Sequence, residues 1–148
     1  MPVRTGRAVW RGTLKGGEGS VQTETAVVDA RYSFSSRFET GRGTNPEELI
    51  AAAHAGCFSM AFAAGLEKAG FTAERISTED RVHIEKVGDA FTITRIETVT
   101  VADVPGIDDG TFQRLAEDAK KNCPVSRALK GVEIGLEARL GGSPSTPR

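Results

Sequence analysis

One segment, Leu49–Leu66, contains no Asp, Glu, Lys or Arg, and it constrains the fold more than any other part of the sequence. Signals for a helix start stand just before it. Asn45 suits the N-cap, and Pro46 suits the first helical position, where no backbone N–H is needed. Glu48 stands where the acidic partner of a capping box belongs, and Gly70 suits the C-terminal cap. Because the segment is apolar on nearly all sides, the sequence predicts a long helix that is central and buried.

The same segment has to be considered as a membrane span. It is rich in alanine and contains His54, Ser59 and two glycines, so it falls short of the roughly 20 strongly apolar residues of a transmembrane helix. The first residues of the chain are not followed by the apolar stretch of a secretory signal. We therefore expect a cytoplasmic protein with no membrane partner.

The composition is that of a globular protein and argues against one class of partner. The chain has 148 residues, with 19 Lys and Arg against 20 Asp and Glu. A net charge of -1 gives no global field that would attract a polyanion, so we expect no nucleic-acid partner. The length suits a single domain, which we place at residues 1–140, followed by a flexible C-terminal tail at residues 141–148.

Outside the long helix, alternating apolar and polar residues predict strands, and residues 15–19, rich in glycine, are interpreted as a hairpin turn between two of them. The expected strands are residues 7–12, 20–28, 31–34, 81–87, 91–101 and 132–140, and the further expected helices are residues 111–122 and 125–130. The resulting order, βββ-α-ββ-αα-β, groups helices and strands rather than alternating them. We therefore expect an α+β fold with antiparallel strands around the central helix.

The two cysteines differ in their sequence environment. Cys57 lies inside the apolar segment, where a free cysteine usually packs as a small hydrophobic residue. Cys123 precedes Pro124 at a helix junction, where free backbone N–H groups favour a thiolate. In a reducing cytoplasm both would be thiols, and a disulfide between them would be catalytic or redox-sensing. Their wide spacing excludes a local Cys-x-x-C site, and with only two histidines in the chain they do not predict a metal site.

Other polar residues near the cysteines have ordinary structural interpretations. His54 lies three residues before Cys57, so the two share one side of the predicted helix. A single histidine in that position is more often a packing or positioning residue than a base. Four cations near Cys123 are interpreted as a solvated helix face rather than as an anion-binding site: Lys120, Lys121, Arg127 and Lys130.

Three segments together resemble the OsmC/Ohr family of thiol-dependent peroxidases. They are Thr44–Met60, with the sequence TNPEELIAAAHAGCFSM, Asn122–Ser126, with the sequence NCPVS, and Arg37–Glu39, with the sequence RFE. The resemblance extends from the first strand to the last, in the family's order of elements. It favours the OsmC branch, because the arginine stands in the segment just before the long helix, whereas the Ohr branch takes it from near the N-terminus.

The resemblance implies a role for four residues. Cys57 would be the peroxidatic cysteine and Cys123 the resolving cysteine, while Arg37 and Glu47 would orient and activate the thiolate. A thiol with a pKa near 8.5 is only a few per cent ionised at neutral pH, so a cationic neighbour makes chemical sense. Peroxide would oxidise Cys57 to a sulfenic acid, which would condense with Cys123 to a disulfide. No cofactor is implied, and the external reductant would be a dihydrolipoyl-type or other small dithiol.

These implied roles contain a geometric tension. Glu47 and Cys57 are ten residues apart, which is about 15 Å along a straight helix, too far for one arginine to contact both. Either the helix breaks near Gly56, or Arg37 and Glu47 reach the sulfur from the second subunit of a dimer. The family forms intertwined homodimers with sites at the interface, so the resemblance favours the second arrangement. From its position alone, Glu47 could simply stabilise the helix dipole.

The function implied by the resemblance is the reduction of organic hydroperoxides, and more weakly of hydrogen peroxide, to alcohols in oxidative or osmotic stress defence. Apolar residues near the cysteines could hold an alkyl chain or belong to the core: Leu49, Ile50, Phe58, Phe62, Phe112 and Val125. Two alternatives remain. The first is a dithiol-disulfide oxidoreductase that acts on proteins. The second is a non-enzymatic stress or small-ligand binding protein on the same fold.

Overall fold

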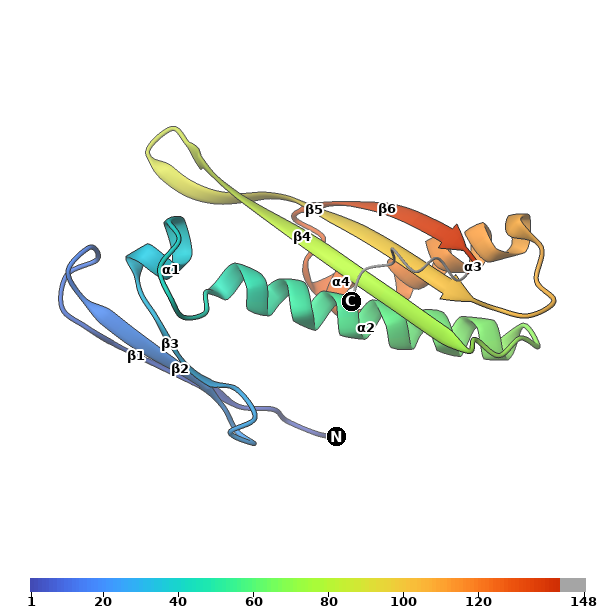
Figure 1. Cartoon of the computed structure of the whole chain (residues 1–148), viewed down its shortest axis with the longest axis horizontal. Helices are drawn as coiled ribbons and strands as arrows, with labels where there is room; N and C mark the ends of the chain where they lie inside the picture. The colour runs from blue at the N-terminus through green and yellow to red at the C-terminus, as the bar shows by residue number, and fades with distance from the viewer. Residues whose placement is uncertain (142–148) are drawn as a thin grey trace. The chain divides into compact units, whose positions relative to one another are not determined.

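The computed structural model describes residues 1–141, which form two compact units, residues 1–49 and residues 50 onward (Figure 1). The observed element order is βββ-αα-ββ-αα-β, one short helix more than the sequence predicts. The mixed α+β class is confirmed. The single domain stays a prediction, and residues 142–148 of the expected tail lie outside the described residues.

The first unit contains a three-stranded antiparallel sheet in the order β1-β2-β3. Its strands are β1 (Gly6–Arg11), β2 (Glu18–Thr23) and β3 (Asp29–Tyr32). The predicted turn between the first two strands is confirmed, since the backbone N–H of Gly17 donates to the carbonyl of Thr13 over 2.8 Å. The second strand ends five residues earlier than predicted, because a turn brings the N–H of Ala26 to the carbonyl of Thr23 over 2.9 Å.

A short helix that the sequence pattern did not predict, α1 (Phe34–Phe38), follows β3. The prediction of strand to residue 34 is therefore wrong from Ser33 onward. Ser33 and Ser36 form a reciprocal capping box, in which the Ser36 N–H donates to Ser33 Oγ over 3.1 Å and the Ser33 N–H donates to Ser36 Oγ over 2.8 Å. Five residues are too few to show a helical period, but this helix carries Arg37.

The long helix is α2 (Pro46–Lys68), which is unbroken at Gly56. Its predicted N-cap is confirmed, because the N–H of Glu48 donates to Asn45 Oδ1 over 2.8 Å. The Glu48 carboxylate accepts a hydrogen bond from the Thr44 hydroxyl over 2.6 Å rather than from the capping backbone, which differs from the expected capping box. The helix ends before Gly70, whose φ of 92° is the left-handed conformation of a C-terminal cap.

The prediction that this helix is buried on all sides is wrong for the described chain. Only one stripe is buried, with Glu47 followed after seven residues by four positions at four-residue spacing: His54, Phe58, Phe62 and Leu66. By length and composition α2 could also cross a membrane, a test that the core helices of soluble proteins pass as well. Small residues between the buried positions are half-buried or exposed, and most of the exposed ones are apolar.

The second unit contains the sheet β4-β5-β6. β4 (Arg75–Val87) and β5 (Ala90–Asp103) form the predicted antiparallel hairpin, but β6 (Glu133–Leu140) pairs with β5 in parallel. The expectation of antiparallel pairing throughout is therefore wrong for β6. Two helices, α3 (Asp109–Asn122) and α4 (Pro124–Ala128), separate β6 from β5, and such a helical crossover returns the chain in a parallel direction.

The core of the second unit lies between α2, α3 and the sheet. On α2, the ring centroids of Phe58 and Phe62 lie 5.7 Å apart, and Phe62 contacts Phe112 from α3 with a centroid distance of 5.3 Å. These three rings are completely buried, and Ala102 and Val104 at the end of β5 join the same cluster. The packing fixes the face of α2 that carries His54, which lies one helical turn before Phe58.

Candidate active site

The structure brings the two cysteines together. Cys57, on α2, has its Sγ 2.8 Å from the Sγ of Cys123, which lies between α3 and α4. Both are free thiols, and this separation lets them share one hydrogen bond. Cys123 is completely buried, whereas Cys57 is partly exposed. A reagent from solvent therefore meets Cys57 first.

Cys123 owes its position to the junction of two helices. It is the C-cap of α3, with its N–H donating to the carbonyl of Ala119 over 2.9 Å, and it is also the N-cap of α4. Pro124 takes the first position of α4, as the sequence predicts. The N–H of Ser126, one of the free donors of the new helix, points to the Cys123 Sγ at 3.5 Å.

The pKa values of the two thiols are shifted in opposite directions. Burial raises the pKa of Cys57, and its hydrogen bond with Cys123 raises it further. Burial also raises the pKa of the Cys123 thiol, but hydrogen bonds from Cys57 and from the N–H and hydroxyl of Ser126 outweigh burial, so this pKa is lowered. When the pair loses one proton, the charge therefore resides on Cys123, and Cys57 donates to it.

The first unit brings Arg37 and Glu47 together. The Arg37 Nη2 donates to Glu47 Oε1 over 2.7 Å, and its Nε lies 3.0 Å and 3.2 Å from the two carboxylate oxygens. Glu47 is buried, whereas the Arg37 side chain is one-third exposed and lies over the ring of Phe38. This two-pronged contact fixes the plane of the guanidinium. Because α2 is unbroken, a helix break near Gly56 does not account for a site containing both Glu47 and Cys57.

His54 takes part in a buried network whose other members the sequence analysis missed. Its Nδ1 contacts the carboxylate of Asp80 on β4, and its Nε2 lies 2.6 Å from the hydroxyl of Ser126 on α4. The sequence analysis expected His54 to be a packing or positioning residue and did not predict its two polar contacts. A signal for Asp80 was present in the sequence, because Asp80 alternates in phase with Val82 and Ile84 and so places a carboxylate on the apolar face of a strand. Ser126 lay within the NCPVS segment but had no assigned role.

The apolar residues proposed to hold an alkyl chain prove largely to be core. Phe58, Phe62 and Phe112 are completely buried in the second unit. An apolar hollow of about 190 Å³ lies instead in the first unit, beside Arg37. Its other lining residues are Trp10, Leu14, Tyr32, Ser33, Phe34 and Phe38.

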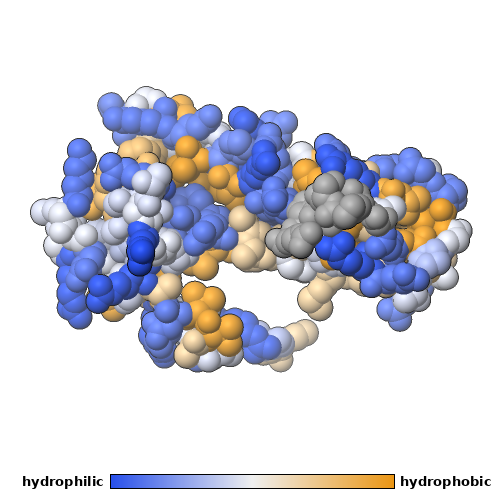
Figure 2. Space-filling view, viewed as in Figure 1, coloured by the Kyte–Doolittle hydropathy of each residue, from blue (hydrophilic) through white to orange (hydrophobic). Residues whose placement is uncertain are grey.

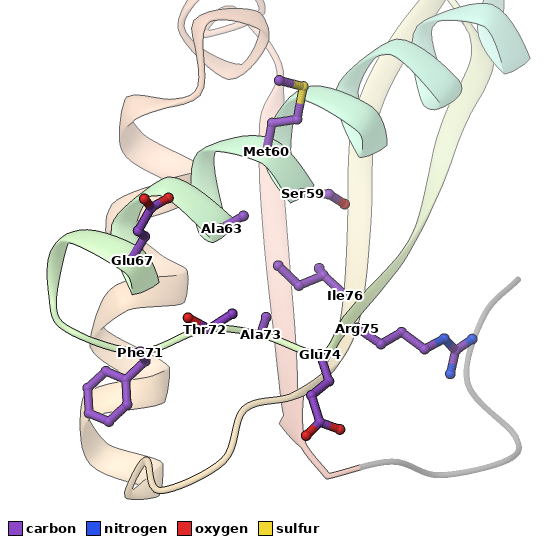
Figure 3. Close-up of a pocket in the computed structure, with 10 residues that line it drawn as sticks. All are labelled: Ser59, Met60, Ala63, Glu67, Phe71, Thr72, Ala73, Glu74, Arg75 and Ile76. Atoms are coloured by element: carbon purple, nitrogen blue, oxygen red, sulfur yellow. The ribbon is translucent and has the colours of Figure 1, made fainter.

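A larger hollow, of about 570 Å³, lies in the second unit between α2 and the segment that leads into β4 (Figure 3). The side chains that Figure 3 labels include Met60, Glu67, Phe71 and Glu74, but no cysteine and no histidine. Size alone therefore does not identify the site. Within residues 1–141, no group of three His, Cys, Asp or Glu side chains is placed to hold a metal ion.

A third hollow, of about 460 Å³, is lined by the four cations near Cys123, together with Ser126, Val132 and Ile134. Lys120 lies 3.0 Å from Glu117 and donates to the carbonyl of Ile134 over 3.3 Å. The predicted solvated face is therefore hollowed, and one of its cations is already paired.

Comparison with known proteins places this geometry in a family. The family profile described as OsmC-like protein matches residues 39–137. Peroxiredoxin OsmC of Escherichia coli is 48% identical over 138 residues, which cover 93% of this chain and 96% of that protein. The organic hydroperoxide resistance protein of Xanthomonas axonopodis pv. citri is 33% identical over 130 residues, covering 84% of this chain and 89% of that one.

Solved structures agree at the level of the fold. The OsmC-like protein of Mycoplasma pneumoniae matches with a TM-score of 0.74 at 14% identity, covering 95% of this chain and 99% of that chain. The organic hydroperoxide resistance protein OhrB of Bacillus subtilis matches with a TM-score of 0.66 at 24% identity, covering 93% and 98%. From the profile match and the sequence relatives, the chain belongs to the OsmC/Ohr family of peroxidases.

Proposed function

We propose that the protein reduces organic hydroperoxides, and hydrogen peroxide more weakly, to alcohols through a Cys57 sulfenic acid and a Cys57–Cys123 disulfide. The observation that carries this proposal is the 2.8 Å separation of the two Sγ atoms, one partly exposed and the other buried. The names of the sequence relatives, a peroxiredoxin and an organic hydroperoxide resistance protein, support the same chemistry.

The first step oxidises Cys57. Its proton passes to the neighbouring Cys123 thiolate, and the Cys57 thiolate attacks one oxygen of the peroxide. The O–O bond breaks, the alkoxide takes up a proton and leaves as the alcohol, and Cys57 becomes a sulfenic acid. In the second step Cys123 gives up the proton that it received, and its thiolate attacks the sulfenic sulfur. The S–S bond forms, and the leaving hydroxide takes up a proton to become water.

An external small dithiol, such as a dihydrolipoyl group, then restores the two thiols. Its thiolate reaches Cys57, the exposed sulfur, and Cys123 is the leaving group. Thiol exchange is faster when the leaving thiol has the lower pKa. The lowered pKa of Cys123 and the burial of its sulfur therefore favour the same direction of attack.

Arg37 would supply the positive charge that Cys57 needs, because burial and Cys123 raise the pKa of Cys57. The Glu47 carboxylate would hold the guanidinium in the orientation that binds sulfur and peroxide oxygen together. In an intertwined homodimer these two residues would reach the Cys57 of the other subunit.

The surface of α2 supports a homodimer. Its exposed face is apolar and made mainly of small residues: Ala52, Ala53, Gly56, Met60, Ala63 and Ala64, with Met60 at 77% exposure. In the space-filling view, hydrophobic residues reach the surface in several places among hydrophilic ones (Figure 2). An uncovered apolar helix face of this kind suits a self-complementary contact with a second copy.

The aromatic hollow beside Arg37 supports an organic substrate. Its rings would bind an alkyl or aryl group through apolar contact, while the guanidinium would face the peroxide. Hydrogen peroxide would gain nothing from such a surface. The cytoplasm, where small dithiols and reduced cysteines are maintained, is the compartment that this cycle requires.

The test is the consumption of cumene hydroperoxide and hydrogen peroxide by the wild type, Cys57→Ser and Cys123→Ser, with a small dithiol as reductant. We expect faster consumption of the organic peroxide by the wild type and none by Cys57→Ser. In a separate reaction without the dithiol, Cys123→Ser should consume one equivalent of peroxide and retain a sulfenic acid that a dimedone reagent traps.

Two other outcomes would favour the alternative functions. Reduction of protein disulfides without peroxide consumption would indicate a dithiol-disulfide oxidoreductase. A wild type that is inactive with several dithiols, and whose thiols stay reduced under peroxide, would indicate a non-enzymatic binding protein.

A further inference from the structure

An unbroken series of polar contacts leads from β4 to the resolving cysteine. The Asp80 carboxylate contacts His54 Nδ1, and His54 Nε2 lies 2.6 Å from Ser126 Oγ. Ser126 in turn lies against Cys123, to which its N–H donates over 3.5 Å. The peroxidase cycle as described so far uses Cys123 and leaves the other three residues without a role.

The burial of this network argues against a purely structural role. The side chains of His54 and Asp80 are both completely buried. Asp80 Oδ1 has no hydrogen-bond partner within residues 1–141, so His54 is the sole described partner of this carboxylate. An incompletely satisfied buried carboxylate costs stability. The Asp80 carboxylate is therefore placed to stabilise positive charge that forms on the imidazole during a reaction.

The arrangement also fixes the direction of proton flow. A carboxylate accepts hydrogen bonds, so the contact with Asp80 keeps a proton on Nδ1 and leaves the lone pair of Nε2 facing the Ser126 hydroxyl. That hydroxyl can give its proton to Nε2 while its oxygen accepts one from Cys123. Once Cys123 is a thiolate, the Ser126 hydroxyl can instead donate to it, and this hydrogen bond lowers the pKa of Cys123.

We propose that Asp80, His54 and Ser126 form a proton relay that deprotonates Cys123 as it attacks oxidised Cys57. This inference rests on the proposed function. The Cys123 S–H bond breaks and its proton goes to Ser126 Oγ, while the Ser126 proton goes to His54 Nε2 and leaves an imidazolium opposite Asp80. The new thiolate forms the S–S bond, and the hydroxide released from Cys57 takes a proton from solvent to become water. His54 later returns its proton to solvent.

The relay assigns different roles to its members. Ser126 contacts the reacting sulfur and is a catalytic residue, whereas His54 accepts the proton through Ser126 and Asp80 positions and stabilises the charged ring. The remaining described contact of His54 is with an apolar ring, Phe58, whose centroid lies 6.5 Å away. Within the described residues, Asp80 is thus the only charged group found in contact with the imidazole.

The test isolates the disulfide step. Reduced protein receives one equivalent of cumene hydroperoxide without a reductant, and timed samples are analysed by mass spectrometry for trapped sulfenic acid and for the disulfide. In Ser126→Ala and His54→Gln we expect the disulfide to form about 10²-fold more slowly, as for the loss of a general base, while sulfenic acid accumulates on Cys57. Ser126→Thr, which keeps the hydroxyl, should recover most of the rate.

Ser59→Ala is the matched control. It removes a 2.8 Å hydrogen bond between Ser59 on α2 and Thr78 on β4, the two elements that His54 and Asp80 connect. It should form the disulfide at the wild-type rate. Equal slowing in Ser59→Ala, or an unchanged rate in Ser126→Ala and His54→Gln, would overturn the relay. A solvent deuterium isotope effect on this step should be present in the wild type and lost in Ser126→Ala.

A second arm does not depend on peroxide. Methyl methanethiolsulfonate places a methylthio group on the exposed Cys57, and attack by Cys123 then forms the disulfide and releases methanethiol. If the wild type never forms a sulfenic acid, the proposed peroxidase function fails. Slower methanethiol release by the relay variants would still support the relay, and an unchanged rate would refute it.

Discussion

Cys57 and Cys123 differ in their position relative to the helices that carry them. Cys57 lies within α2, whereas Cys123 lies where α3 ends and α4 begins, with the N–H of Ser126 directed at its sulfur. The pKa is raised for the first thiol and lowered for the second. The comparison teaches that hydrogen bonds from a neighbouring thiol and from the first turn of a helix can favour a thiolate without a charged side chain. A thiol in the middle of a helix has no free backbone donors of that helix, so a cation from elsewhere would have to favour its thiolate.

Among the changes that test this difference between the two thiols, removal of the Arg37 cation should have the largest effect on activity. We expect Arg37→Ala to lower kcat/KM for cumene hydroperoxide by about 10²–10³-fold, because in the proposed function the guanidinium favours the Cys57 thiolate and the developing alkoxide. Arg37→Lys should recover part of the rate, since it keeps the charge but not the two-pronged contact with Glu47. Steady-state peroxide consumption measures both, with the exposed Arg42→Ala as the control. Wild-type activity in Arg37→Ala would show that Cys57 needs no such cation.

Replacing either cysteine with alanine should have the next largest effect, which is a shift in the pKa of the remaining thiol. In Cys57→Ala the pKa of Cys123 should rise, because its sulfur loses a hydrogen-bond donor. In Cys123→Ala the pKa of Cys57 should fall, because the thiol that shares its hydrogen bond is gone. Ultraviolet absorbance of the thiolate against pH measures each remaining thiol alone. If both pKa values moved in the same direction, the two thiols would not be coupled as described.

The smallest expected effect is on the helix that ends at Cys123. Asp108 caps α3, with its carboxylate accepting from the N–H of Thr111 over 2.9 Å, so Asp108→Ala should slightly lower the free energy of unfolding. Hydrogen bonds from the Thr111 N–H and hydroxyl lower the pKa of Asp108. The cap is therefore fully effective above the pKa of the unfolded chain and is lost as the pH falls through the folded value.

Denaturant unfolding at neutral and acid pH should show this difference between wild type and Asp108→Ala shrink in acid. Asp109→Ala, which changes the neighbouring acid, is the control. A difference that stayed constant with pH would remove the capping role of the carboxylate.

The sequence predicted best those features that depend on neighbouring residues. Asn45 and Gly70 mark the ends of α2, and the β4-β5 hairpin follows from alternation and a short turn. The features that it missed depend on few residues or on distant ones. The short α1 shows no period, and the parallel pairing of β6 depends on where α3 and α4 return the chain.

In the candidate site, too, residues in sequence motifs were predicted, whereas contacts between distant elements were not. Family resemblance singled out Cys57, Cys123, Arg37 and Glu47 from motif residues, and the structure forms two contacting pairs from them. Asp80 could not be connected to His54 from sequence, because β4 and α2 meet only in the folded chain. The all-round apolarity of α2 also misled the prediction of its burial, since an exposed apolar helix face and a core face look alike in sequence.

The unequal exposure of the two sulfurs also bears on oxidative damage. A sulfenic acid that waits in solvent is open to a second peroxide, which converts it irreversibly to a sulfinic acid. Here the reagent that captures it is already 2.8 Å away and is itself shielded from peroxide. The pair would therefore be oxidised in a fixed order, Cys57 before Cys123. Overoxidation should become appreciable only when peroxide arrives faster than the local reaction between the two sulfurs.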